Sequence, residues 1–263
     1  MDIKALFDIS GKTAVVTGGS RGIGRMIAEG FVSAGADVFI TARKADACDA
    51  AAAELNEMGP GKCVSIPFNV AGEEGAKAFA AIIAERTPKV DILVNNAGAT
   101  WGASIEDFPD EAWDKVLDIN VKGLFQLTSK LLPQLRAAAT AEDPARVINI
   151  GSVDGINVPG TQNYAYAASK AAVHHLTRQM GHNLLRDHIT VNAIAPGPFY
   201  SKMMAFILDA DGGEEAVAKG VPLGRIGTPE DVAGLSIFLS SRAGSYLTGA
   251  VIACDGGIST RSG

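Results

Sequence analysis

The chain has 263 residues, of which 47% are hydrophobic and 20% charged, so it is long enough for one large domain with a well-developed core. Its formal charge of −6 argues against binding nucleic acid through charge. Widely spaced Cys48, Cys63 and Cys254, without metal-ligand spacing, favour reduced thiols. No apolar segment of signal length opens the chain and no run of about eighteen apolar residues occurs, so we expect a cytoplasmic enzyme with no membrane partner.

Short apolar, β-branched runs alternate with longer helical patterns along the chain. The predicted strands are 12–17, 37–42, 62–69, 91–96, 146–152, 189–195 and 250–255. Because these runs are continuously apolar, both faces of their sheet should be covered by helices. The pattern predicts an α/β protein: a single Rossmann-type doubly wound domain over 1–263, with a seven-stranded parallel sheet.

A glycine-rich turn, "TGGSRGIG" at 17–24, follows the first predicted strand and opens a helix. With Gly18, Gly22 and Gly24 in this context, backbone amides and the helix N-terminus can receive a pyrophosphate. The alternative is a tight turn between strand and helix that binds nothing. The spacing differs from the commoner GxGxxG dinucleotide pattern.

The second predicted strand ends in "FITARK", which bears on the choice of nicotinamide cofactor. Ala42 stands where an NAD enzyme usually carries an acidic residue that binds the ribose 2′-hydroxyl. Arg43 follows it, and Arg21 adds a second cation in the glycine turn. Arginine pairs well with a 2′-phosphate, so NADP(H) is predicted; ordinary solvated surface charges are the alternative.

The segment "YAYAASK" at 164–170 places two tyrosines before a lysine in a predicted helix that Gly and Pro do not interrupt until Gly181. Tyr166 and Lys170 are four residues apart and share a face, whereas Tyr164 points elsewhere. A nearby ammonium lowers the pKa of a phenol, which would let Tyr166 act as a general acid or base. The alternative is a half-buried tyrosine packed beside a lysine. Tyr164 is expected to be a pocket wall or a packing residue.

The least regular stretch, about 198–224, follows a strand end, where a substrate lid is expected. Its apolar residues would suit a hydrophobic substrate or would pack on the core: Phe199, Met203, Met204, Phe206, Ile207 and Leu208. The histidines form no ligand cluster, so no metal site is predicted and they are expected to be surface or helix-packing residues: His174, His175, His182 and His188.

As an ordered set, these motifs resemble the short-chain dehydrogenase/reductase family over nearly the whole chain. The set comprises "TGxxxGxG" at 17–24, "NNAG" at 95–98, Asn120 in "INVKG", Ser152 ending the fifth predicted strand, "YxxxK" at 166–170, "PG" at 196–197 and "TGxxxxxDGG" at 248–257. The stretches "GGSRGIG", "NNAGATWGA", "ARVINIGSVDGI" and "APGPFYSKM" are most similar to the rhamnolipid-biosynthesis type of 3-oxoacyl (β-ketoacyl) reductase.

The resemblance implies a role for each matching residue. Tyr166 would protonate the substrate carbonyl oxygen, Ser152 would donate a hydrogen bond to it, and Lys170 would lower the pKa of Tyr166 and hold the nicotinamide ribose. Asn120 would fix a water in the proton relay. The implied cofactor-binding residues are Gly18, Ser20, Arg21, Gly22, Ile23, Gly24, Arg43, Asn69, Val70, Asn96, Ala97, Gly98, Tyr166, Lys170, Pro196, Gly197 and Ser201. The resemblance also implies a homotetramer.

The chain departs from the family pattern at a few positions. Asn69 replaces the usual adenine-contacting aspartate, and its side-chain carbonyl can still accept a hydrogen bond. Ser152 lies one residue further from Tyr166 than is usual, in a loop whose Asp154 and Asn157 either face the substrate or are solvated. Asp187 stands where reductases that use acyl carrier protein often carry arginine. That counts against the usual docking site, although Arg136 and Arg186 are available.

The sequence therefore predicts an NADPH-dependent carbonyl reductase that converts a small-molecule ketone, 3-oxoacyl or otherwise apolar-tailed, to a secondary alcohol. One alternative is a secondary alcohol dehydrogenase that works in the oxidative direction. Another is a non-catalytic NADP-binding sensor, because a fold alone does not confer activity.

Overall fold

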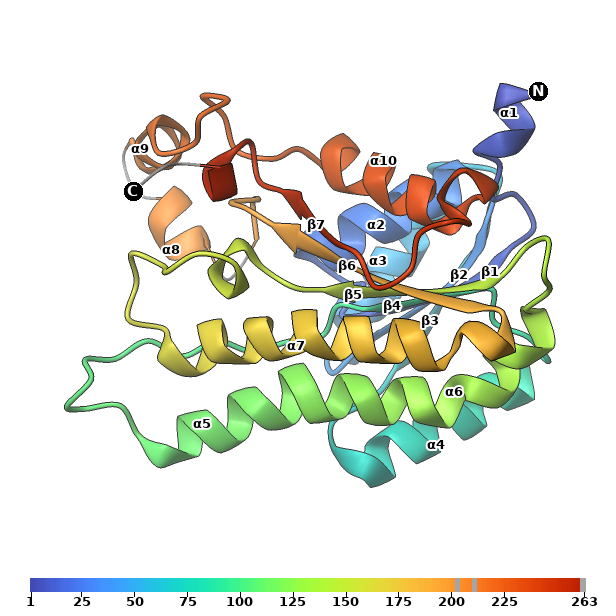
Figure 1. Cartoon of the computed structure of the whole chain (residues 1–263), viewed down its shortest axis with the longest axis horizontal. Helices are drawn as coiled ribbons and strands as arrows, with labels where there is room; N and C mark the ends of the chain where they lie inside the picture. The colour runs from blue at the N-terminus through green and yellow to red at the C-terminus, as the bar shows by residue number, and fades with distance from the viewer. Residues whose placement is uncertain (202–203, 210–211, 261–263) are drawn as a thin grey trace.

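The computed structural model describes residues 1–201, 204–209 and 212–260, and its centre is a seven-stranded, entirely parallel sheet in the order β3-β2-β1-β4-β5-β6-β7 (Figure 1). The strands are β1 Thr13–Thr17, β2 Asp37–Ala42, β3 Cys63–Pro67, β4 Ile92–Asn95, β5 Ala145–Ile150, β6 Ile189–Pro196 and β7 Val251–Cys254. Every predicted strand is present, so the predicted fold class is confirmed.

Helices cover both faces of the sheet (Figure 1). They are α1 Ile3–Leu6, α2 Gly22–Ser33, α3 Ala45–Leu55, α4 Gly72–Arg86, α5 Asp110–Leu117, α6 Leu124–Ala138, α7 Tyr164–Asn183, α8 Ala205–Leu208, α9 Gly213–Lys219 and α10 Pro229–Ser240. One buried apolar cluster joins α2, α3 and α10 to the sheet, and a second joins α4, α6 and α7 to the opposite face. Two-sided coverage explains why the strands read as continuous apolar runs.

The chain reverses its direction of progress across the sheet between β1 and β4, which are neighbours although they are not consecutive in sequence. In doubly wound sheets, ligands bind at the carboxyl ends of the strands beside such a reversal. The glycine turn after β1, the "NNAG" segment after β4 and Ser152 after β5 all lie at this edge. Within the described ranges, no helix is both long enough and apolar enough to cross a membrane.

Helix α7 continues through Gly181 to Asn183, although glycine weakens a helix. The reason is close packing, since a Cβ at Gly181 would lie 2.8 Å from the backbone nitrogen of Gly249. Gly249 precedes β7, so the small residue lets the chain entering β7 pass directly over the helix. The predicted helix therefore extends beyond its expected interruption.

Candidate active site and cofactor site

The glycine turn between β1 and α2 is held by the side chain of Asn96. Gly18 and Gly22 adopt positive φ values of 67° and 54°, which favour glycine. A Cβ at Gly18 would lie 2.8 Å from Asn96 Nδ2, and one at Gly24 would overlap the same amide. Asn96 Nδ2 donates hydrogen bonds to the carbonyl oxygens of Thr17, at 2.8 Å, and Gly18, at 3.3 Å. The absence of side chains at these glycines therefore makes room for the amide that shapes the turn.

Thr17 joins the carboxyl ends of β1 and β4. Its hydroxyl oxygen accepts hydrogen bonds from the backbone N–H groups of Asn96, at 2.9 Å, and Ala97, at 3.0 Å. The same hydroxyl donates to the Val94 carbonyl oxygen at 3.3 Å. Sequence reasoning assigned no role to this threonine, although its place at the head of the glycine motif was a signal for one.

Two exposed arginines lie at the edge of the cofactor site. Arg21 is the N-cap residue of α2, and Arg43 directly follows β2. Neither forms an ion pair with another described residue, so both guanidinium groups are available to an anion. Asn69 is exposed after β3, where its side-chain oxygen accepts from the Ala71 N–H at 3.3 Å; Val70 beside it is half-buried.

The remaining cofactor-site residues line the same edge of the sheet. Half-buried Ser20 and Ile23 belong to the glycine turn, and Ala97 and Gly98 follow Asn96. Pro196 ends β6, and Gly197 has no room for a side chain because its Cβ would lie 2.8 Å from the Asp255 Cα. Ser201 reaches the glycine turn, since its Cβ is 3.2 Å from the place that a Cβ on Gly22 would occupy. The structure thus brings the segments after β1, β4 and β6 together.

Tyr166 and Lys170 project from one face of α7 toward the end of β5. Lys170 is only 6% exposed, and its Nζ donates to the Ile150 carbonyl oxygen at 2.7 Å. The same Nζ lies over the Tyr166 ring, 5.4 Å from its centroid. Ser152, 7% exposed, is two residues beyond Ile150, and its hydroxyl is a hydrogen-bond partner of Tyr166. Lys170 is therefore paired with Tyr166 and not with Tyr164, as the helical spacing predicted.

The pKa of Tyr166 is shifted in the direction opposite to the sequence-based prediction. Burial raises this pKa to about 12, the Asp154 charge adds to the rise, and only the hydrogen bond with Ser152 lowers it. Burial also lowers the pKa of Lys170 to about 8, against the opposing effect of Asp154. Desolvation disfavours the charged form of both groups, which helical spacing alone does not reveal. Tyr166 is consequently protonated at neutral pH, as a proton donor must be.

Asn120 lies in a π-helix, Asp118–Gly123, between α5 and α6. Its Oδ1 accepts from the Ala99 N–H at 2.8 Å, and its Nδ2 donates to the Ala99 carbonyl oxygen and to Ser169 Oγ, both at 2.9 Å. Both amide hydrogens and the carbonyl oxygen are therefore used within the protein. The side chain anchors the loop after β4, and water binding by this residue stays a prediction.

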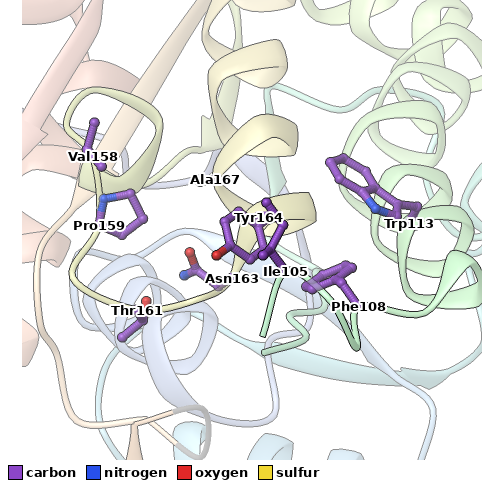
Figure 2. Close-up of a pocket in the computed structure, with 9 residues that line it drawn as sticks. All are labelled: Ile105, Phe108, Trp113, Val158, Pro159, Thr161, Asn163, Tyr164 and Ala167. Carbon is purple, nitrogen blue, oxygen red and sulfur yellow. The ribbon is translucent and has the colours of Figure 1, made fainter. Parts of the chain in front are cut away.

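A mostly apolar cavity of about 470 Å³ opens beside Tyr164 (Figure 2). Its lining comes from the loop before α5, from α5, and from the loop and first turns of α7: Ile105, Phe108, Trp113, Val158, Pro159, Thr161, Asn163, Tyr164 and Ala167. The Phe108 ring centroid lies 5.8 Å from that of Trp113 and 5.6 Å from that of Tyr164. Tyr164 and Ala167 belong to the first turns of α7, the helix that also carries Tyr166, whose side chain is not among the lining residues.

Sequence reasoning foresaw only Tyr164 as a possible wall of this cavity. The signal that it missed was the aromatic pair Phe108 and Trp113, a short distance after the "NNAG" segment. For two apolar residues of the segment at 198–224, the structure shows the predicted alternative of packing on the core. Phe199 is 2% exposed and packs in the core against Gly227, and Leu208 is buried as well. Met203 and the side chains of Phe206 and Ile207 lie outside the described residues, and Met204 is half-buried.

The polar residues around Ser152 and before β6 are largely engaged by the protein. Asn163 Nδ2 donates to Asp154 Oδ2 at 2.8 Å, and Asn157 Nδ2 donates to the Ile258 carbonyl oxygen at 3.2 Å. Arg136 pairs with Asp187 at 2.8 Å, so the sequence-based suggestion that Arg136 is available for docking is wrong. Arg186 is exposed.

The four histidines are dispersed. His175 and His182 are exposed, His188 occupies a left-handed turn with a φ of 54°, and His174 is buried beneath the Ser152 turn. Over the part of the chain that the structure describes, no three metal-ligating side chains lie together.

The fold and site define a dinucleotide-binding α/β protein with a glycine-rich turn and a buried tyrosine–lysine pair. A short-chain dehydrogenase family model, described as enoyl-(acyl carrier protein) reductase, matches residues 18–259. The chain belongs to the short-chain dehydrogenase/reductase family, as its motifs predicted, and it is an oxidoreductase.

The chain is similar to both reductases and dehydrogenases. The rhamnolipids biosynthesis 3-oxoacyl-[acyl-carrier-protein] reductase of Pseudomonas aeruginosa is 49% identical over 251 residues, covering 95% of this chain and 97% of the relative. The Pseudomonas aeruginosa RhlG/NADP active-site complex superposes with a TM-score of 0.94, over 97% of this chain and 99% of that one, at 49% identity. The 2-dehydro-3-deoxy-D-gluconate 5-dehydrogenase of Bacillus subtilis is 37% identical, covering 95% and 96% of the two chains.

Proposed function

We propose that the protein is an NADPH-dependent carbonyl reductase that converts an apolar-tailed ketone, of the 3-oxoacyl type, to a secondary alcohol. The observation that carries this proposal is the grouping of Ser152, Tyr166 and Lys170 at the end of β5. An apolar cavity, lined in part by Tyr164 and Ala167 from the first turns of the helix that carries Tyr166, supports it. A ketone in that cavity would have its tail among aromatic rings and its carbonyl near the two hydroxyl groups. The similar 3-oxoacyl reductase supports this choice of substrate class.

NADP(H) is the cofactor, and the residues present fit it. The turn at Gly18 and Gly22 leaves backbone amides unobstructed at the start of α2, where a pyrophosphate is favourably bound. The unpaired guanidinium of Arg43 after β2 is suited to a 2′-phosphate, and no carboxylate occupies the Ala42 position. When bound, the reduced nicotinamide supplies the hydride that the ketone carbon accepts.

The chain's own residues then handle the oxygen and its proton. Ser152 donates a hydrogen bond to the carbonyl oxygen, and Tyr166 gives this oxygen a proton from its hydroxyl as negative charge develops there. Lys170, which is held by the Ile150 carbonyl, would stabilise by its positive charge the phenolate left on Tyr166, and it would also hold the nicotinamide ribose. The buried setting strengthens this electrostatic interaction.

A homologous series of 3-oxoacyl esters, followed by NADPH absorbance, tests the substrate class. We expect reduction whose kcat/KM rises with tail length. Each methylene that the cavity buries should lower the activation free energy by up to about 0.8 kcal/mol. Trp113→Ala should flatten the series, because it removes a cavity wall, whereas Trp101→Ala, outside the lining residues, should not. No turnover of any ketone would contradict the reductase, and a flat wild-type series would contradict the cavity as the tail site.

The segment at 198–224 is proposed to act as a lid on the cofactor side of the same site. The position of Ser201 against Gly22 supports this role, since its hydroxyl would then face the nicotinamide end of the cofactor. The tail contacts that sequence reasoning gave to this segment are instead assigned to the cavity in Figure 2.

The pH profile of reduction should fall as pH rises through about 8. Tyr166, with a pKa of about 12, keeps its proton over this range, whereas Lys170, with a pKa of about 8, loses its charge. A neutral lysine no longer stabilises the phenolate formed by proton donation, so kcat should decline on the alkaline side. Lys170→Arg, whose side chain stays charged, should remove the decline even if its rate is lower. A decline that persists in this variant would show that another group titrates.

Two alternatives are separated by the same assays. An oxidative alcohol dehydrogenase would turn over secondary alcohols with NADP⁺ faster than it reduces their ketones at matched pH. A non-catalytic NADP-binding sensor would bind the cofactor but turn over no substrate in either direction. A cytoplasmic location, supported by the free thiols of Cys48, Cys63 and Cys254, and a homotetramer complete the proposal.

A further inference from the structure

His174 lies one helical turn beyond Lys170 on α7, on the face that carries Tyr166. It is only 4% exposed, and its imidazole fills the space beneath residues 151–155, which hold Ser152. A Cβ at Gly151 would overlap His174 Nε2, and one at Gly155 would lie 2.8 Å from its Cε1. The ring therefore touches the backbone at both ends of the Ser152 turn, and glycine at both positions permits this contact.

The turn has few other anchors. The Gly151 N–H donates to the Ile194 carbonyl oxygen at 2.7 Å, which fixes its first residue to β6. The N–H of Asp154 donates to Ser152 Oγ at 3.1 Å, and the N–H of Gly155 donates to the Ser152 carbonyl oxygen at 3.0 Å. These last bonds are internal to the turn. Against α7 the turn is held by the hydrogen bond from Asn163 Nδ2 to Asp154 Oδ2, at 2.8 Å, and by close packing of Gly155 on the backbone of Lys170 and Ala171. The imidazole adds the contact that reaches both Gly151 and Gly155, on either side of Ser152.

An imidazole is also energetically less favourable than an apolar side chain for filling this space. Its Nε2 is buried without a hydrogen-bond partner among the described residues. Buried polar atoms are nearly always paired, and an apolar side chain of similar size would avoid the unpaired nitrogen. Burial lowers the pKa of His174 to about 4, so the ring is neutral near pH 7 and Lys170 has no second cation beneath it. Core filling alone therefore does not account for a histidine here.

We propose that His174 is a positioning residue for the reaction: through Gly151 and Gly155 it sets the place of the Ser152 hydroxyl relative to Tyr166. This inference rests on the proposed ketone reduction. It differs from a stability role in what it predicts for an apolar replacement. A leucine would leave the core filled and relieve the unpaired Nε2, yet it would remove the imidazole's hydrogen bond with the Gly155 backbone.

The test compares His174→Leu, His174→Asn and His174→Gln with His175→Leu, a change at the exposed neighbouring histidine. His174→Leu is expected to melt at or above the wild-type temperature, to keep its KM for NADPH, and to lose about 10- to 10²-fold in kcat, because a small misplacement of a reacting group is costly. Asparagine, whose amide can take the place of the imidazole in its hydrogen bond with the Gly155 backbone, should restore most of kcat. Glutamine, whose amide lies further out, should not.

Two further measurements test whether His174 acts through the Ser152 turn. In the Ser152→Ala background, His174→Leu should lower kcat little further, since both changes act through one hydroxyl. Amide hydrogen exchange at 152–157, which needs no substrate, should accelerate in His174→Leu and stay unchanged in His175→Leu. Wild-type kcat or wild-type exchange in His174→Leu would overturn the proposal. Failure of the wild-type enzyme to reduce any ketone would overturn the function instead, and exchange would still report on the turn.

Discussion

Tyr166→Phe is expected to lower kcat for ketone reduction by about 10²-fold or more, because it removes the hydroxyl group proposed to give the carbonyl oxygen its proton. Tyr166 shares a helical face with Lys170, and it is protonated at neutral pH because burial raises its pKa to about 12. NADPH binding, measured by fluorescence titration, should change little. The loss should therefore appear in single-turnover rates of hydride transfer.

Tyr164→Phe is the matched control for that experiment. It removes the same hydroxyl two residues away but keeps the ring that packs on Phe108 in the cavity. Its kcat should stay close to that of the wild-type enzyme, with any change confined to the KM of long-tailed ketones. Equal activity in the two variants, or a larger loss in Tyr164→Phe, would refute the assignment of the proton donor.

Arg43→Ala is expected to raise the KM for NADPH by about 10- to 10²-fold while the KM for NADH changes little. A charge-assisted contact to the 2′-phosphate contributes about 1.5 to 3 kcal/mol, and about 1.4 kcal/mol corresponds to tenfold in affinity. Because Arg43 is exposed, salt screens the contact, so the effect should shrink as ionic strength rises. Steady-state kinetics with both cofactors at two salt concentrations measure it.

Lys44→Ala provides the comparison, since it removes the adjacent exposed cation from the same strand end. A general loss of positive charge near the cofactor would act equally in both variants. Similar KM values for NADPH in Arg43→Ala and Lys44→Ala, or wild-type enzyme that binds NADH as tightly as NADPH, would contradict a specific phosphate contact at Arg43.

Much of the site was predictable because it depends on spacing within a single element. Tyr166 pairs with Lys170 because four residues make about one helical turn, whatever the rest of the chain does. The glycine turn was predictable for a related reason, since it lies between a strand and a helix that are adjacent in sequence. The strands were recognisable because a sheet covered on both faces needs continuous apolar runs.

Other properties of the same residues depend on segments that are distant in sequence. The cavity is built from the loop before α5 and the start of α7, and neither segment marks it alone. The Ser152 turn lies over His174, a contact visible only once β5 is packed against α7. Arg136 seemed free in the sequence but pairs with Asp187, 51 residues away.

The sequence by itself thus determined the order of strands and helices, the glycine turn, and the side chains that share a face with Tyr166, because short-range periodicity dictates these. Only the tertiary structure decided that the pKa of Tyr166 rises rather than falls, that Asn96 fills the space left by Gly18 and Gly24, and that His174 lies beneath Ser152. The physical reason is that burial and electrostatics depend on which atoms packing brings within a few ångströms, and packing joins residues irrespective of their separation along the chain.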